Sequence, residues 1–206
     1  MWVTGMIDTT ELRDRIKTAK TSGDANEVLR LCREGVASTE SGASFIDWYA
    51  MRANLALYLQ KDGGESAIEE SISVYRSILT RVRAENISDK LPLISMYLAG
   101  LYTERRTGSR IENLNQAVTY YEVAVKLMNP RQESLLWASV VTQLGEAYVD
   151  LGELSGAPLV EVNSLKRLLR TAVRIFRRKE CAEECGEAST ALRRLFMTEL
   201  EFKIRR

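Results

Sequence analysis

Two short patterns recur along this chain and constrain its fold more than any other feature of the sequence. The first is a leucine followed by a small residue, at Leu55-Ala56, Leu98-Ala99 and Leu144-Gly145, with intervals of 43 and 46 residues. Trp48 and Trp137 stand seven residues before the first and the last of these leucines. Self-similarity at such intervals indicates a chain built from repeated structural units.

The second pattern follows the first and is centred on a tyrosine. SISVYRSIL (Ser71 to Leu79) aligns with AVTYYEVAV (Ala117 to Val125), so that Tyr75 matches Tyr121. SLKRLLRTA (Ser164 to Ala172) is a weaker third copy, and VLRLCREGV (Val28 to Val36) is a degenerate fourth. Spacings of three and four place the recurring residues on one helical face. We therefore predict hairpins of two helices, which must stack because one hairpin cannot bury its apolar face alone.

The composition favours helix throughout the chain. It contains three prolines, and long stretches are rich in Ala, Leu, Glu and Arg. We expect helices near 9–20, 24–38, 43–60, 66–83, 90–104, 111–128, 133–151, 159–178 and 180–204. Turns are expected at Thr21–Asp24 with Asp24 as an N-cap, and at Ser38–Ser44, Lys61–Ser66, Glu104–Arg110 and Leu151–Pro158.

The combined pattern L-[GA]-x-x-Y, then A-x-x-x-Y-x-x-A and a downstream proline, resembles the tetratricopeptide repeat family. The matching residues are Leu144, Gly145 and Tyr148 for the first helix, and Ala117, Tyr121, Ala124 and Pro130 for the second. The ordinary repeat has 34 residues, so the chain is similar to the longer bacterial variety, whose inter-helix segment reads much like GSRIENL (Gly108 to Leu114). That variety is associated with CHAT-type caspase-like peptidases and with signalling ATPases.

The resemblance covers about residues 41 to 178 and implies an all-α, right-handed superhelical stack of antiparallel helix pairs. We expect one helical-repeat domain over residues 1–206. Its parts are a degenerate unit at 9–38, clearer units at 41–83, 89–128 and 133–178, and a capping helix at 180–204. The capping helix should present a soluble outer face to the solvent.

The sequence contains no recognisable catalytic constellation. Histidine is absent, which removes the commonest general base and zinc ligand. Neither a phosphate-binding glycine loop nor a G-x-S-x-G nucleophile elbow is present. Cys181 and Cys185 would share one helical face, but structural zinc needs four ligands and Cys32 is the only other cysteine. We therefore predict a protein that is not an enzyme and that has no cofactor and no metal.

The resemblance also implies a ligand groove lined by the first helix of each hairpin. The candidate groove residues are Leu57, Gln60, Lys61, Met96, Thr103, Glu104, Thr142, Glu146, Val149 and Asp150, with Ala53 and Gly100 at equivalent positions. The family's clamp for a terminal carboxylate is missing, because Ala53, Leu57 and Ser139 occupy its positions. A groove that mixes apolar side chains with carboxylates suits a basic or amphipathic helical segment.

A stripe of arginines lies on the predicted helix at 159–178. It consists of Arg167, Arg170, Arg174, Arg177 and Arg178, opposite an apolar face. From residue 158 onward there are 12 basic and 7 acidic residues, although the whole chain has a net charge of only +1. The stripe is either a solvated helix face or a docking face for an acidic partner or for the backbone of RNA.

These observations favour a non-catalytic, cytoplasmic protein-interaction module, an adaptor or a sensing part of a larger assembly. Its partner would be a protein or peptide, with a peptidase or ATPase of the same system as one candidate. The alternative hypothesis is an RNA- or DNA-binding helical repeat that uses the arginine stripe. Nothing in the sequence indicates a membrane partner, because no apolar run approaches the roughly 18 residues of a membrane span.

Overall fold

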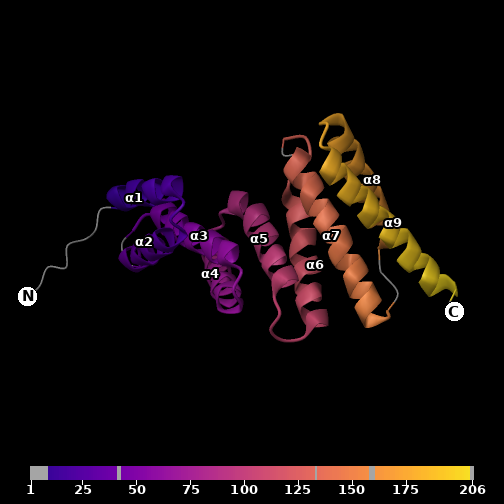
Figure 1. Cartoon of the computed structure of the whole chain (residues 1–206), viewed down its shortest axis with the longest axis horizontal. Helices are drawn as coiled ribbons and strands as arrows, with labels where there is room; N and C mark the ends of the chain where they lie inside the picture. Colours follow the sequence, from indigo (N-terminus) through magenta and orange to yellow (C-terminus); the bar gives the residue numbers. More distant parts are fainter. Residues whose placement is uncertain (1–8, 41–42, 133, 158–160, 205–206) are drawn as a thin grey trace, which may run out of the picture. The chain divides into compact units, whose positions relative to one another are not determined.

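The computed structural model describes residues 9–40, 43–132, 134–157 and 161–204, and this part of the chain is all-helical. The α-helices are α1 (Thr9–Ser22), α2 (Ala25–Ser38), α3 (Phe45–Asp62), α4 (Glu65–Ala84), α5 (Leu91–Glu104), α6 (Arg110–Leu127), α7 (Ser134–Ser155), α8 (Val162–Arg178) and α9 (Ala182–Ile204), with a short 3-10 helix, η1 (Ser88–Lys90), before α5. The chain forms two compact units, an N-terminal unit that ends at Asn86 and a C-terminal unit that begins at Ile87 (Figure 1).

The prediction of nine helices is confirmed for the described residues, and each observed helix begins and ends close to its predicted bounds. The side chain of Asp24 accepts a hydrogen bond from the backbone of Glu27, as expected for an N-cap, and Gly63 ends α3 with a φ of 69°. The longest discrepancy is at α7, which continues to Ser155 and stops before Gly156, whose φ is 63°. The predicted bounds at 41–42, 133 and 158–160 lie outside the described residues.

The N-terminal unit is a series of four helices in which α1 packs on α2, α2 on α3 and α3 on α4. Its core joins all four helices through Leu12, Ile16, Leu31, Met51, Leu55, Leu59 and Ala67, among others. Gly35 on α2 lies directly against Met51 on α3, so that a side chain there would collide with the methionine sulfur. The absence of a Cβ at Gly35 therefore sets how closely these two helices approach.

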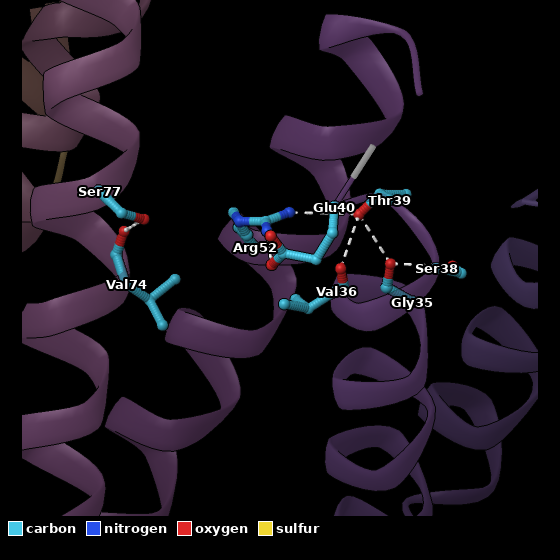
Figure 2. A network of polar contacts seen from close by, with 8 residues as sticks. All are labelled: Gly35, Val36, Ser38, Thr39, Glu40, Arg52, Val74 and Ser77. Atoms are coloured by element: carbon cyan, nitrogen blue, oxygen red, sulfur yellow. Dashed lines mark hydrogen bonds and ion pairs between the residues drawn. The ribbon is translucent and has the colours of Figure 1, made fainter. Parts of the chain in front are cut away.

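A buried arginine fastens α3 to the end of α2. Arg52 donates to Oγ1 of Thr39 over 3.2 Å and pairs with the carboxylate of Glu40, as Figure 2 shows. Its guanidinium also lies 4.4 Å from the ring centroid of Trp48, whose ring is contacted at the same distance by Arg81. Burial lowers the pKa of Arg52, and Glu40 opposes that effect. Arg52 therefore has a structural role, and its buried guanidinium has hydrogen-bond, ion-pair and aromatic partners.

The C-terminal unit continues the same kind of packing from α5 to α9, each helix against the next, and α9 packs against α7 as well as α8. Lys166 on α8 is buried and pairs with Glu199 on α9, which also accepts from Lys203 over 3.0 Å. On the other side of α9, Arg194 reaches Asp150 and Glu153 of α7. Polar contacts therefore hold α9 against both of its neighbours.

The recurring small residues lie where the two helices of a hairpin meet. Ser71 of α4 donates a hydrogen bond of 2.8 Å to the carbonyl oxygen of Ala56 on α3. In the third hairpin, a Cβ on Gly145 would lie 3.0 Å from both terminal carbons of Leu169 on α8. Tyr75 and Tyr121 are buried on the second helices, as packing residues should be. The proposed roles of the small and aromatic positions in helix packing are supported by these contacts.

The sequence alignment of α8 with α6, the second helix of the preceding hairpin, is out of register by one residue. The buried positions of α6 include Ala117, Val118, Tyr121, Ala124 and, just beyond its end, Met128; those of α8 include Leu165, Lys166, Leu169, Ala172 and Phe176. Ala117 therefore corresponds to Leu165, and the alignment with Ser164 is wrong. The cause is Lys166, which occupies a core position that is apolar in the other copies.

The close packing at Gly145 generates a stability prediction. We expect Gly145→Val to lower the free energy of unfolding by about 1–3 kcal/mol, because the new side chain overpacks the contact with Leu169. Gly186→Ala on α9 is the matched control, since a Cβ there meets nothing within 4 Å. That change should stabilise by about 0.5–1 kcal/mol through helix propensity. Urea unfolding followed by circular dichroism measures both; a neutral Gly145→Val would contradict the packing role.

Candidate binding faces

The candidate groove residues of the N-terminal unit lie on α3 with part of each side chain accessible. Leu57 and Gln60 are half-buried, and Lys61 is exposed. The ammonium of Lys61 lies 4.9 Å from the ring centroid of Tyr58, and Lys20 of α1 approaches the same ring. This face of α3 is therefore aromatic and basic, whereas the groove as a whole was expected to be acidic.

The candidate residues of the C-terminal unit divide into accessible and buried groups. Met96, Thr103 and Glu146 are half-buried, and Glu104 is exposed. Thr142 and Val149, in contrast, are only 4% and 0% exposed. Their assignment to an open groove is wrong, because α7 packs against α6, α8 and α9 and these two side chains are buried within that packing.

The accessible part of α7 forms an acidic cluster together with α9. It comprises Glu146, Asp150 and Glu153 from α7 and Glu187 from α9, with Arg194 of α9 as the cation among them. Arg194 donates over 2.8 Å to Asp150 and over 3.0 Å to Glu153. In the described part of the chain, this guanidinium thus pairs with two of the four carboxylates, and Glu146 and Glu187 share no ion pair with it.

The charge of Glu146 is only partly compensated. Its pKa is raised first by burial, then by the neighbouring charges of Glu187 and Asp150, while Arg194 opposes the rise. The hydroxyl of Tyr121 lies in the same electrostatic environment, and its pKa is raised to about 12, chiefly by burial and further by Glu104 and Glu146. Side chains from α5, α6, α7 and α9 therefore converge on a region of negative potential.

The arginine stripe is exposed along α8, as the sequence predicts. In the described part of the chain, Arg167, Arg170, Arg174, Arg177 and Arg178 form no ion pair with a carboxylate. Arg167 donates to the hydroxyl of Ser164, and Arg174 donates to the hydroxyl of Thr171 and the carbonyl of Arg170. Their charges are thus available to a ligand.

The outer face of α9, predicted to be a soluble cap, carries exposed apolar side chains as well as polar ones. Phe196, Met197, Leu200 and Ile204 are 40%, 53%, 50% and 75% exposed. The other large exposed apolar residues of the described chain, such as Ile46, Leu127 and Leu154, are spread over different helices. The four residues of α9 fall instead within three turns at spacings of three and four, which places them on one side of the helix.

The cysteines occupy ordinary packing and surface positions. All three are free thiols, and burial raises the pKa of Cys32 to about 11. The sulfur atoms of Cys181 and Cys185 approach the carbonyl oxygens of Lys179 and Val173. Within the described residues, no group of three or more Cys, Asp or Glu side chains is placed to hold a metal ion. The same residues include no helix with the length and apolar character needed to cross a membrane.

Comparison of the sequence with protein-family models and with curated proteins gave no match. The candidate faces therefore depend on the geometry alone.

Sequence reasoning found part of each face and missed the rest. It placed Glu146, Asp150 and the arginines, but it missed Glu187 and Arg194, because α9 lies outside the repeat pattern. The apolar side of α9 was visible as a spacing of four from Phe196 to Leu200 to Ile204. That same spacing describes a buried face, so the signal did not show that these residues are exposed.

The acidic cluster generates a pH-dependent stability prediction. Because the folded pKa of Glu146 is raised, ionisation of this carboxyl opposes folding at any pH above that pKa. We expect Glu146→Gln to raise the free energy of unfolding at pH 7 by about 0.2–1 kcal/mol, the scale of partly exposed charge interactions. The gain should shrink as the pH falls and vanish below about 4, the range of an unperturbed glutamate.

Arg194→Gln is the counterpart, since it removes the cation that offsets the cluster. It should lower stability at pH 7 and have less effect at pH 4, where the carboxylates take up protons. Thermal unfolding of both variants across this pH range tests the pair. Equal effects at the two pH values would show that Glu146 and Arg194 do not interact through charge.

Proposed function

We propose that this protein is a non-catalytic helical-repeat module that binds a basic or amphipathic helical segment of a partner protein at the acidic α7–α9 face. In this proposal the hairpins are arranged as in a tetratricopeptide superhelix, and the module acts as an adaptor or sensing part of a larger assembly. The acidic face is the set Glu146, Asp150, Glu153 and Glu187, with Glu104 and Met96 of α5 as candidate flanking contacts.

The observation that carries the proposal is the incompletely compensated charge of Glu146. Burial is the first cause of its raised pKa and the charges of Glu187 and Asp150 raise it further, so a cation bound nearby would offset this second effect. Arg194 already shows how such a cation is held, because one guanidinium contacts Asp150 and Glu153 at hydrogen-bond distance. Lysine or arginine side chains of a bound helix would supply the charge that Arg194 alone does not.

The surroundings of Glu146 suit a peptide better than a small molecule. The carboxylates recur along α7 at positions 146, 150 and 153, so they follow one helical face for two turns. A helix laid beside them would present basic side chains at the same spacing. Half-buried Met96 on α5 supports an apolar contact in the same unit.

A displayed library of helical peptides roughly 20 residues long, about 30 Å of helix, tests the proposal. Selection on the full chain should return basic amphipathic peptides. Charge reversal by Glu146→Lys with Asp150→Lys should weaken their binding about tenfold or more and make the remaining affinity less sensitive to salt. Fluorescence anisotropy of a selected peptide across a range of salt concentrations measures both effects.

The matched control reverses two exposed acids in the N-terminal unit, Asp14→Lys with Asp62→Lys. It introduces the same change in net charge and should leave affinity within about twofold. If the control weakens binding as much as the α7 variant, net charge rather than the acidic face accounts for the interaction. Unchanged affinity in the α7 variant would remove this face from consideration.

A further inference from the structure

A second surface of the C-terminal unit combines the exposed apolar residues of α9 with the arginines of α8. The surface is defined by Phe196, Met197, Leu200 and Ile204 together with Arg167, Arg170, Arg174, Arg177 and Arg178, and we call it the α8–α9 outer face. It is separate from the acidic face, because Arg194 and Glu187 point from α9 toward α7. Helices α8 and α9 pack against each other (Figure 1), so the two rows belong to neighbouring helices.

The two rows meet at Phe196. The guanidinium of Arg170 lies 5.5 Å from the centroid of the Phe196 ring, and the ammonium of Lys166 lies 3.9 Å from it. Lys166 is buried and paired with Glu199, so it fixes the position of α9 along α8. Because Lys166 meets Glu199 and Cys185 meets Val173, the two helices run antiparallel. Arg167 and Arg170 therefore lie level with the apolar row as its basic border, and the remaining arginines continue past Phe196 beside the N-terminal half of α9.

The basic border is uncompensated within the described chain. Helix α8 contains no aspartate or glutamate, and its five exposed arginines bond only to hydroxyl and carbonyl groups of their own helix where they bond at all. On α9, Glu199 is already shared between Lys166 and Lys203. A ligand that carries carboxylates would therefore complement the positive charge of these arginines.

We propose that the α8–α9 outer face binds an acidic amphipathic helix of a partner protein. The apolar residues at positions 196, 197, 200 and 204 form a single seam of the width that one helix covers. In the C-terminal unit each of α6, α7 and α8 packs against the helix before it and the helix after it, and α9 is the last helix described. A bound helix would cover the seam of α9 as these helices cover one another, with Asp or Glu beside Arg167 and Arg170 over the seam. Further carboxylates would lie beside Arg174 and Arg177 where the bound helix continues past Phe196 along α9.

The exposed apolar seam favours a protein helix over a nucleic acid as the ligand of this face. A phosphate backbone would engage the arginines but leave Met197, Leu200 and Ile204 in water, and nothing in its chemistry would bury them. Exposed apolar patches of this kind mark protein-binding surfaces when polar residues surround them. The combination of a seam and a basic border therefore favours an acidic helix.

Selection from the same library of helical peptides tests this inference independently of the proposed function. We expect a second class of selected peptides, with apolar residues at i, i+3, i+4 and i+7 and carboxylates along one edge. Their affinity should fall about tenfold or more in Arg170→Glu with Arg174→Glu, and equally in Met197→Ser with Leu200→Ser. It should be unchanged in the Glu146→Lys with Asp150→Lys variant, which disables only the acidic face.

Two control variants match the chemistry of the changes. Arg76→Glu with Arg106→Glu reverses two exposed basic residues elsewhere, and Leu127→Ser with Leu154→Ser removes two scattered exposed apolar residues. Both should keep the affinity for the acidic peptide within about twofold. Thermal unfolding verifies that each variant is folded, and Met197→Ala with Leu200→Ala replaces the serine pair if that pair melts early.

Five results would overturn the inference. A selection that returns no acidic class, or acidic peptides insensitive to both pairs of changes, leaves the face without its proposed ligand. Tighter binding of oligouridine RNA, lost only in the arginine variant, assigns the stripe to nucleic acid. Binding of phosphatidylserine vesicles, lost in both variants, assigns the face to a lipid surface. A dimer in light scattering that Met197→Ser with Leu200→Ser dissociates assigns it to a second copy of the chain.

Discussion

The close approach of two helices at a residue with little or no side chain is the contact on which the hairpins depend. Ala56 receives a hydrogen bond from Ser71 of the next helix, and Gly145 leaves room for Leu169. Because dispersion and apolar burial act only over short distances, this proximity lets each helix bury a stripe against its successor. Which side chains of the C-terminal unit are exposed then depends on which helices pack beside them. Helix α9 covers part of α7, whereas apolar side chains on the outer side of α9 are exposed.

Helix positions could be predicted from the sequence because their determinants are local. Asp24 caps α2 and Gly63 ends α3 through contacts within a few residues. The register of α8 could not, because Lys166 occupies the core position held by Ile72 and Val118 in the other hairpins. From the sequence alone, a lysine is expected at the surface. Its ion-pair partner Glu199, which offsets the cost of burying its charge, lies 33 residues away in the sequence. Only the packing of α9 on α8 reveals that pair.

The same limit applies to the binding faces. A groove deduced from the repeat pattern includes Thr142 and Val149, but both are buried in the structure, where α7 packs against three other helices. The periodicity of Phe196, Leu200 and Ile204 predicts an apolar face but cannot say whether anything covers it. Charge was more informative, because exposed arginines and carboxylates stay at the surface wherever the neighbouring helices lie. This is why the exposure of the arginine stripe could be predicted from the sequence, whereas the exposure of the apolar seam could not.

Helix α9 contributes to both faces, so the question is whether a ligand at one disturbs the other. A basic segment at the acidic face would compete with Arg194 for Asp150 and Glu153. That guanidinium is accessible to solvent, so losing its ion pairs costs at most about 1 kcal/mol. The buried pair of Lys166 with Glu199 and the buried side chains Ala188, Ala191 and Leu195 would stay in place. The burial of each of these aliphatic side chains stabilises the packing of α9 by about as much as both ion pairs of Arg194 together. Helix α9 would therefore keep its position if a ligand occupied the acidic face, and the two proposed ligands would not exclude one another.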